Sequence, residues 1–96
     1  MKHLFLVNPA AGKRGSTEAV LRRVEEAFSP LGLEHEVVLT SSAGDAEQLA
    51  RRAACSGGPV RIYACGGDGT LNEVVNGAAG YPNAAVTNVP KGTGND

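Results

Sequence analysis

Short apolar runs alternate with amphipathic runs along the whole chain. The strand-like runs span residues 4–7, 33–40, 60–65 and 84–89. The helix-like runs, in which apolar side chains recur at the i, i+3, i+4 spacing, span residues 17–28, 45–55 and 71–78. Regular alternation of strands and helices favours a parallel sheet with right-handed helical connections. The pattern therefore predicts an α/β fold, a doubly wound parallel sheet with the element order βαβαβαβ.

The polar positions within the predicted strands indicate where each strand lies in the sheet. Residues 4–7 are continuously apolar, which is typical of a central strand buried on both faces. Residues 33–40 alternate apolar and polar side chains, which favours a half-exposed strand at an edge of the sheet. His35 lies in this edge strand, and we interpret it as structural.

Three loops that leave predicted strands have residues suited to binding phosphate. They are residues 8–15, 66–70 and 90–96, whereas the loop at residues 41–44 has no such character. Ligands of open α/β sheets bind beyond the carboxyl ends of the strands, where the strand order reverses. The strand order 2-1-3-4 would bring the three loops together and leave the second strand at an edge. We therefore predict this order.

The most informative stretch is residues 65–73, which read Cys-Gly-Gly-Asp-Gly-Thr-Leu-Asn-Glu between a predicted strand and a predicted helix. A helix N-terminus offers unpaired amides, and glycines let the main chain approach an anion and adopt positive φ. Thr70 and Glu73 have the spacing of a capping box, which would place the first helical turn close to Thr70. Asp68 would repel a phosphate, so it is expected to face a cation such as Mg²⁺ or to order the loop. The alternative is a plain glycine-rich turn in which Asp68 is a turn former.

Charged and polar side chains on the other two loops extend the phosphate hypothesis. Lys13 is a natural counter-charge for phosphate and Arg14 a second candidate, with solvated loop cations as the alternative. Asn95 and Asp96 could join Asp68 in a polar corner suited to a metal or a ribose, with simple turn chemistry as the alternative. No Gly-x-x-x-x-Gly-Lys-Ser/Thr occurs, and no Gly-x-Gly-x-x-Gly follows the first strand. These two absences argue against a Walker-type loop and against the usual dinucleotide fold.

Composition narrows the class of protein. The 96 residues allow one domain. The net charge of −1 and the low share of aromatic residues, 4%, argue against binding to nucleic acid. Cys55 and Cys65 have no metal-ligand spacing, so they are interpreted as a reduced, cytosolic pair. The apolar run near Met1 is too short for a signal peptide, and no transmembrane span is predicted. Residues 90–96 look ready to start another helix, so we expect the chain to be part of a longer protein.

Three motifs in this order resemble the diacylglycerol kinase catalytic domain, which bacterial-type lipid kinases share with sphingosine and ceramide kinases. The motifs are Asn8-Pro9 with Gly12-Lys13, the run Gly-Gly-Asp-Gly-Thr-Leu-Asn-Glu-Val-Val-Asn-Gly at residues 66–77, and Pro-x-Gly-Thr-Gly-Asn-Asp at residues 90–96. NAD kinases and, more remotely, phosphofructokinases share the element at residues 66–70. Asn72-Glu73 and the ending at residues 92–96 favour the lipid kinases.

The resemblance implies that residues 1–96 are an incomplete N-terminal α/β domain that binds ATP with Mg²⁺. A C-terminal β-sandwich domain, absent from this chain, would supply the lipid site of this two-domain kinase. The reaction would transfer the ATP γ-phosphoryl to a lipid hydroxyl, with diacylglycerol converted to phosphatidic acid as the favoured case. Asp68 and Asp96 would support Mg²⁺, directly or through water. The residues expected to bind the nucleotide are Asn8, Pro9, Gly12, Lys13, Gly66, Gly67, Asp68, Gly69, Thr70, Glu73, Gly92 and Thr93.

The resemblance also implies what these 96 residues lack. No catalytic residue is expected among them, because the general base would lie in the C-terminal domain, so the fragment alone should be inactive. Lys91 stands where the family often has an apolar or small residue. The full protein is expected to be cytoplasmic, to touch the inner face of the membrane peripherally and to bind no nucleic acid, and a homodimer is left open. The alternatives are an NAD kinase-like phosphotransferase and a non-catalytic nucleotide-binding module.

Overall fold

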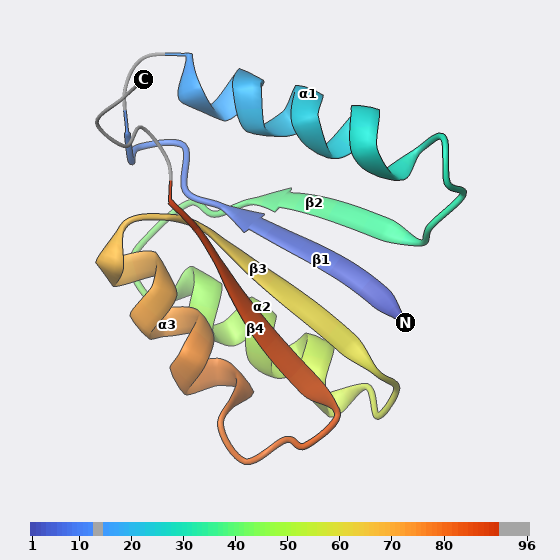
Figure 1. Ribbon diagram of the computed structural model, residues 1–96. Helices are drawn as coiled ribbons and strands as arrows, with labels where there is room; N and C mark the ends of the chain where they lie inside the picture. Colours follow the sequence, from blue (N-terminus) through green and yellow to red (C-terminus); the bar gives the residue numbers. More distant parts are fainter. Residues whose placement is uncertain (13–14, 91–96) are drawn as a thin grey trace.

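The computed structural model describes residues 1–12 and 15–90. Strands and helices alternate along the chain in the order βαβαβαβ, as predicted (Figure 1). The strands are β1 (Lys2–Val7), β2 (His35–Leu39), β3 (Val60–Gly66) and β4 (Ala84–Pro90). The helices are α1 (Ser16–Phe28), α2 (Asp45–Cys55) and α3 (Asp68–Ala78). Among the described residues, no helix is long and apolar enough to cross a bilayer.

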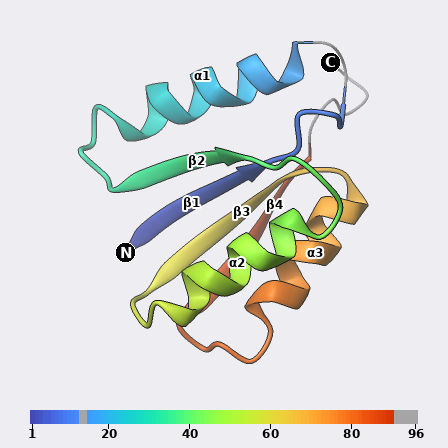
Figure 2. The ribbon, with the colours of Figure 1, turned by 180° about the vertical axis from the view of Figure 1, so that it is seen from behind.

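The four strands form one parallel sheet in the order β2-β1-β3-β4. This is the predicted order 2-1-3-4. In the register of the sheet, Phe5 of β1 pairs with Val37 of β2 on one side and with Tyr63 of β3 on the other. Helix α1 lies on one face of the sheet, and α2 and α3 lie on the opposite face (Figures 1 and 2). The doubly wound class predicted from the alternation is therefore confirmed.

Two apolar cores lie on the two faces of the sheet, and β1 contributes to both. Leu4 and Leu6 belong to the core under α2 and α3, while Phe5 and Val7 belong to the core under α1. All four of these side chains are buried, which confirms β1 as a central strand. Full burial of such a side chain contributes about 1.5–3 kcal/mol, so β1 anchors the sheet from which the loops project.

Helices α2 and α3 pack closely because Gly77 has no side chain. A Cβ at Gly77 would fall on the carbonyl oxygen of Glu47 and would lie 2.8 Å from Cβ of Ala50. Ala46, Ala50 and Ala54 present a buried stripe of small side chains on α2. This close contact holds the two helices, and the loops at their N-termini, in one fixed arrangement.

Candidate functional site

The loops that follow β1, β2 and β3 begin at the same end of the sheet. The amide of Asn8 donates to the carbonyl of Cys65 at 2.9 Å, and the amide of Thr40 donates to the carbonyl of Val7 at 2.9 Å. Both bonds join the residue after one strand to the last part of its neighbour. Parallel pairing therefore brings three strand ends, far apart in the sequence, to one rim (Figure 1).

A cavity of about 380 Å³ opens at this rim. Its walls are the loop after β1, the loop after β2 and the first turns of α3. Five of the residues expected to bind the nucleotide line it: Asn8, Pro9, Gly69, Thr70 and Glu73. The other lining residues are Ala10, Thr40, Ser41, Ser42, Ala43 and Ala46. The loop of residues 40–43 is thus a wall of the cavity, although its sequence has no phosphate-binding signature.

Several predicted site residues do not line this cavity or cannot be placed. Gly12 lies in the loop after β1 with φ +81°, and it is exposed. Lys13, Gly92, Thr93 and Asp96 lie outside the described residues, as do Arg14, Lys91 and Asn95. Among the described lining residues, Glu73 is the one with an ionisable side chain, so the mapped part of the cavity has no cation of its own.

Thr70 joins the start of α3 to the end of β1. The side-chain amide of Asn8 donates to Oγ1 of Thr70 at 3.5 Å, and Oδ1 of Asn8 accepts from the amide of Ala10 at 3.0 Å. Thr70 is buried, with 6% of its surface exposed. A Cβ at Gly66 would fall on Oγ1 of Thr70 and would lie 3.4 Å from Cβ of Asn8. Gly66 is therefore required by the packing of the fold.

Gly67 and Gly69 differ from Gly66 because no packing contact requires them to be glycine. Both are exposed, and a Cβ at either would meet no atom within 4 Å. Gly67 has φ −104° and ψ −162°, a conformation open to any residue. None of Gly66, Gly67 and Gly69 has positive φ, so the backbone conformation of this turn does not require glycine. The turn is tight because Gly66 packs against Thr70, and the two exposed glycines leave the N-terminus of α3 open to solvent.

Helix α3 begins at Asp68, three residues before the predicted start, with Gly67 as its N-cap. The predicted capping box is wrong, because no side chain caps this helix. The carboxylate of Glu73 instead accepts a hydrogen bond from the amide of Gly44, at 3.0 Å. Sequence reasoning could not find this partner, because the two residues are 29 positions apart and meet only when α2 packs on α3.

Asp68 is the first residue of α3 and is exposed. A carboxylate at this position is stabilised by the partial positive charge of the helix N-terminus, which gives Asp68 a structural role independent of any metal. Within the mapped chain, no group of three or more His, Cys, Asp or Glu side chains could hold a metal ion. Mg²⁺ in phosphate sites is commonly held by one or two carboxylates together with phosphates and water, so a single exposed carboxylate at this rim fits that arrangement.

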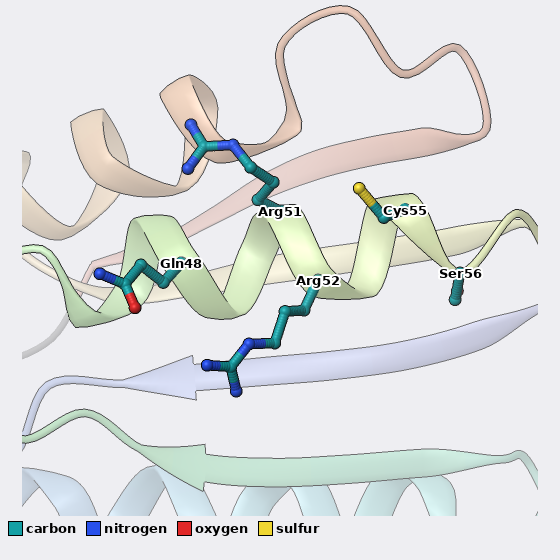
Figure 3. Close-up of a pocket in the computed structure, with 5 residues that line it drawn as sticks. All are labelled: Gln48, Arg51, Arg52, Cys55 and Ser56. Atoms are coloured by element: carbon teal, nitrogen blue, oxygen red, sulfur yellow. The ribbon is translucent and has the colours of Figure 1, made fainter.

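A larger hollow, of about 540 Å³, lies on the outer side of α2 and has a different character. It is lined by Gln48, Arg51, Arg52, Cys55 and Ser56. In Figure 3 the side chains of Arg51 and Arg52 point to opposite sides of the helix, so they do not converge on a common ligand. Arg51 pairs with Glu47 at 3.0 Å, and Sγ of Cys55 lies 2.8 Å from the hydroxyl of Tyr81. The rim cavity remains the candidate site because it gathers groups from three loops.

Comparison with known proteins adds an independent line of observation. Residues 2–96 match the family described as "Diacylglycerol kinase catalytic domain". Over 93 residues the chain is 41% identical to the diacylglycerol kinase of Bacillus subtilis (strain 168), covering 96% of this chain and 30% of that protein. Over 79 residues it is 40% identical to sphingoid long-chain bases kinase 1 of Arabidopsis thaliana, covering 79% of this chain and 10% of that protein.

A solved structure shares the fold. The crystal structure of a diacylglycerol kinase from Bacillus anthracis str. Sterne matches with a TM-score of 0.70 and 30% sequence identity, covering 99% of this chain and 34% of that one. The chain spans about a third of the length of the bacterial relatives that it matches.

Proposed function

Because the chain belongs to the diacylglycerol kinase catalytic domain family, we propose that it is the ATP-binding portion of a lipid kinase. The whole enzyme would transfer the γ-phosphoryl group of ATP to a lipid hydroxyl. We further propose diacylglycerol as the substrate and phosphatidic acid as the product. The relative from Bacillus subtilis supports this choice by its name, while the plant relative, a kinase of sphingoid bases, makes other lipid hydroxyls the competing outcome.

The observation that supports the proposal most directly is the open N-terminus of α3. The first backbone bond of this helix runs from the amide of Leu71 to the carbonyl of Gly67, at 3.1 Å. The amides of the three preceding residues, 68–70, therefore have no helical carbonyl to pair with. Such amides bind phosphate oxygens, and the bare backbone at Gly67 and Gly69 leaves them accessible.

The site residues fall into two groups in this proposal. The backbone at residues 66–70 would hold the nucleotide phosphates, and Asn8, Pro9 and Thr40 would form the adjacent walls of the cavity. Asp68 would hold Mg²⁺, which when bound would neutralise part of the phosphate charge. Roles for residues outside the mapped chain stay predictions: Lys13 would neutralise phosphate charge, Gly92 and Thr93 would line the nucleotide, and Asp96 would support the metal.

These residues would position the nucleotide and stabilise the negative charge of its phosphates. Phosphoryl transfer requires little covalent chemistry from the protein, so holding the nucleotide in line with the acceptor supplies much of the rate. We propose that the general base and the lipid site belong to a second, β-sandwich domain outside this chain. On this view residues 1–96 alone are inactive, and the full protein is a cytoplasmic enzyme that reaches its substrate by peripheral contact with the membrane.

The proposal is tested with the natural full-length protein. Titration calorimetry should detect binding of ATP in the presence of Mg²⁺, and thin-layer chromatography should detect phosphorylated diacylglycerol when vesicles containing it are supplied with ATP. Phosphorylation of NAD in place of lipid would make the protein an NAD kinase relative. Binding of ATP with no transfer to any acceptor would leave a nucleotide-binding module, and absence of ATP binding would refute the proposal.

A further inference from the structure

Glu73 connects two walls of the rim cavity. It lies in the second turn of α3, the helix whose N-terminus is the proposed phosphate site. Its Oε2 accepts a hydrogen bond from the amide of Gly44 at 3.0 Å, in a partly buried position. Gly44 is the N-cap residue of α2 and directly follows the wall formed by residues 40–43. One side chain therefore holds the β2–α2 loop against α3.

The same loop has a second anchor that acts within the loop itself. Oδ2 of Asp45 accepts hydrogen bonds from the amide of Ser41 at 2.8 Å and from its hydroxyl at 3.2 Å. These contacts close the loop on itself across four residues, and they set its shape. They do not reach α3. Among the hydrogen bonds described for this loop, the bond from Gly44 to Glu73 is the one that joins the loop directly to α3.

We propose that Glu73 is a positioning residue that sets the width of the nucleotide cavity, and that it contacts neither the nucleotide nor the metal. This inference rests on the proposed function. It replaces the expectation that Glu73 binds the nucleotide directly. A carboxylate facing phosphate oxygens would repel them, whereas a carboxylate that accepts a backbone hydrogen bond from the neighbouring loop stabilises the site without touching the ligand. Without this bond, the loop would be held near α3 only through the packing of α2, the helix that follows it.

The negative charge of Glu73 matters if the residue binds the metal directly, and it does not matter if the residue only positions the loop. A metal ligand needs the negative charge of Glu73, and Glu73→Gln would remove it. The hydrogen bond from the amide of Gly44 needs only an oxygen that can accept it, and the side-chain carbonyl of glutamine provides one at the same distance from the backbone. Glu73→Ala removes both the acceptor and the charge. Glu73→Met removes both while keeping the length of the side chain, and it serves if the alanine variant fails to fold.

The experiment measures the KM for ATP and kcat of the full-length enzyme, together with the exchange rate of the Gly44 amide by NMR. Glu73→Ala should raise the KM for ATP by about tenfold, the change that corresponds to 1.4 kcal/mol, with kcat at saturating ATP within about twofold of wild type. It should also speed exchange of the Gly44 amide. Glu73→Gln should keep KM within about threefold of wild type and keep the amide protected.

Glu47→Ala is the matched control. It also removes a glutamate from a neighbouring helix, but its carboxylate pairs with Arg51 on the surface of α2, away from the cavity. It should leave KM, kcat and the Gly44 amide unchanged. A loss of kcat in Glu73→Gln as large as in Glu73→Ala would assign Glu73 a charge role and overturn the inference, as would an unchanged KM in Glu73→Ala. Wild-type protein that binds no ATP would instead refute the proposed function, since the exchange measurement reports on the bond from Gly44 to Glu73 without nucleotide.

Discussion

The side-chain amide of Asn8 lies 3.5 Å from Oγ1 of Thr70 and donates a hydrogen bond to it, although the two residues are 62 positions apart. The contact joins the residue after β1 to the first turn of α3. Gly66 packs against both residues, since a side chain at this position would collide with Thr70 and approach Asn8. The two loops with the clearest phosphate-binding character thus meet through a packed contact that leaves no room for a further atom.

Gly66→Ala should therefore damage the fold. The added methyl group has to displace the buried Thr70 side chain, and overpacking of this kind costs about 1–3 kcal/mol. We expect the free energy of unfolding, measured by urea titration of the full-length protein, to fall by that amount. ATP binding should weaken along with it, because Thr70 is part of the first turn of α3. An unchanged unfolding midpoint would show that Thr70 can move aside freely.

Gly69→Ala should stabilise the fold, in contrast to Gly66→Ala, but like that variant it should weaken the binding of ATP. Gly69 lies within α3, where alanine is favoured over glycine by about 0.5–1 kcal/mol, and its Cβ would point into open space. We expect the free energy of unfolding to rise by that amount while the Kd for ATP rises at least about tenfold. The measurements are urea titration and calorimetry on the same preparations.

Gly67→Ala is the companion variant at the N-cap position. Alanine is a poorer N-cap than glycine, so a small loss of stability, up to about 1 kcal/mol, is expected. The loss of ATP affinity should exceed this loss of stability, because the methyl group obstructs the approach of phosphate to the backbone. Equal losses in stability and affinity would mean that the glycine serves only the architecture of the turn. Retained affinity in both Gly67→Ala and Gly69→Ala would place the phosphates elsewhere.

Asp68→Asn should change the response of the intact enzyme to Mg²⁺. If Asp68 holds the metal, the concentration of Mg²⁺ that gives half-maximal activity should rise about tenfold or more, since a neutral amide is a much weaker ligand for a hard cation. Glu18→Gln is the control. Glu18 also lies in the first turn of a helix, α1, and does not line the rim cavity, so this variant loses the same favourable interaction with a helix dipole without changing the lining of the cavity. Unchanged Mg²⁺ dependence in Asp68→Asn would remove Asp68 from the neighbourhood of the metal.

Stability should fall in mild acid because of His3. Burial lowers the pKa of His3 from its ordinary value of 6.5, and the N-terminal ammonium, Arg61 and His35 lower it further. The unfolded chain then binds a proton more readily than the folded protein, so this contribution to stability is complete above pH 6.5 and is lost as the pH falls below it. Urea titrations between about pH 7.5 and pH 5 should show this decline.

His3→Gln should reduce the decline, because the variant has no imidazole to protonate. Tyr63→Phe is the informative companion, since it removes the hydroxyl that lies 2.8 Å from Nδ1 of His3 and leaves the stacked ring in place. It should retain the acid sensitivity. An identical pH dependence in wild type and His3→Gln would assign the effect to other groups.

The elements of this fold could be predicted because local periodicity reports local burial. The continuous apolar run at residues 4–7 indicated a strand covered on both faces, and Phe5 and Leu6 are buried on opposite faces of the sheet. The alternation after Leu33 indicated an edge strand, and β2 lies at an edge. The strand order then followed from the requirement that the loops with phosphate-binding residues lie together. No long-range contact had to be known for these inferences.

The candidate site could be predicted only in part, because spacing along the chain does not identify partners from other elements. Thr70 and Glu73 have the spacing of a capping box, but the carboxylate of Glu73 instead accepts a hydrogen bond at 3.0 Å from the amide of Gly44, the N-cap residue of α2. The loop of residues 40–43 has no distinctive composition, yet it forms a wall of the cavity because β2 pairs with β1.

The sequence by itself determined the class of fold, the order of its strands and the glycine-rich turn after which the third helix begins, because these depend on the periodicity and on turn residues within short stretches of chain. Tertiary structure alone decided which glycine serves packing and which leaves the backbone bare, as Gly66 and Gly69 show. It also decided that the carboxylate of Glu73 accepts a hydrogen bond from the amide of Gly44. The physical reason is that these roles depend on which atoms of distant segments come within a few ångströms, and only the packing of α2 on α3 and of β1 beside β3 brings them there.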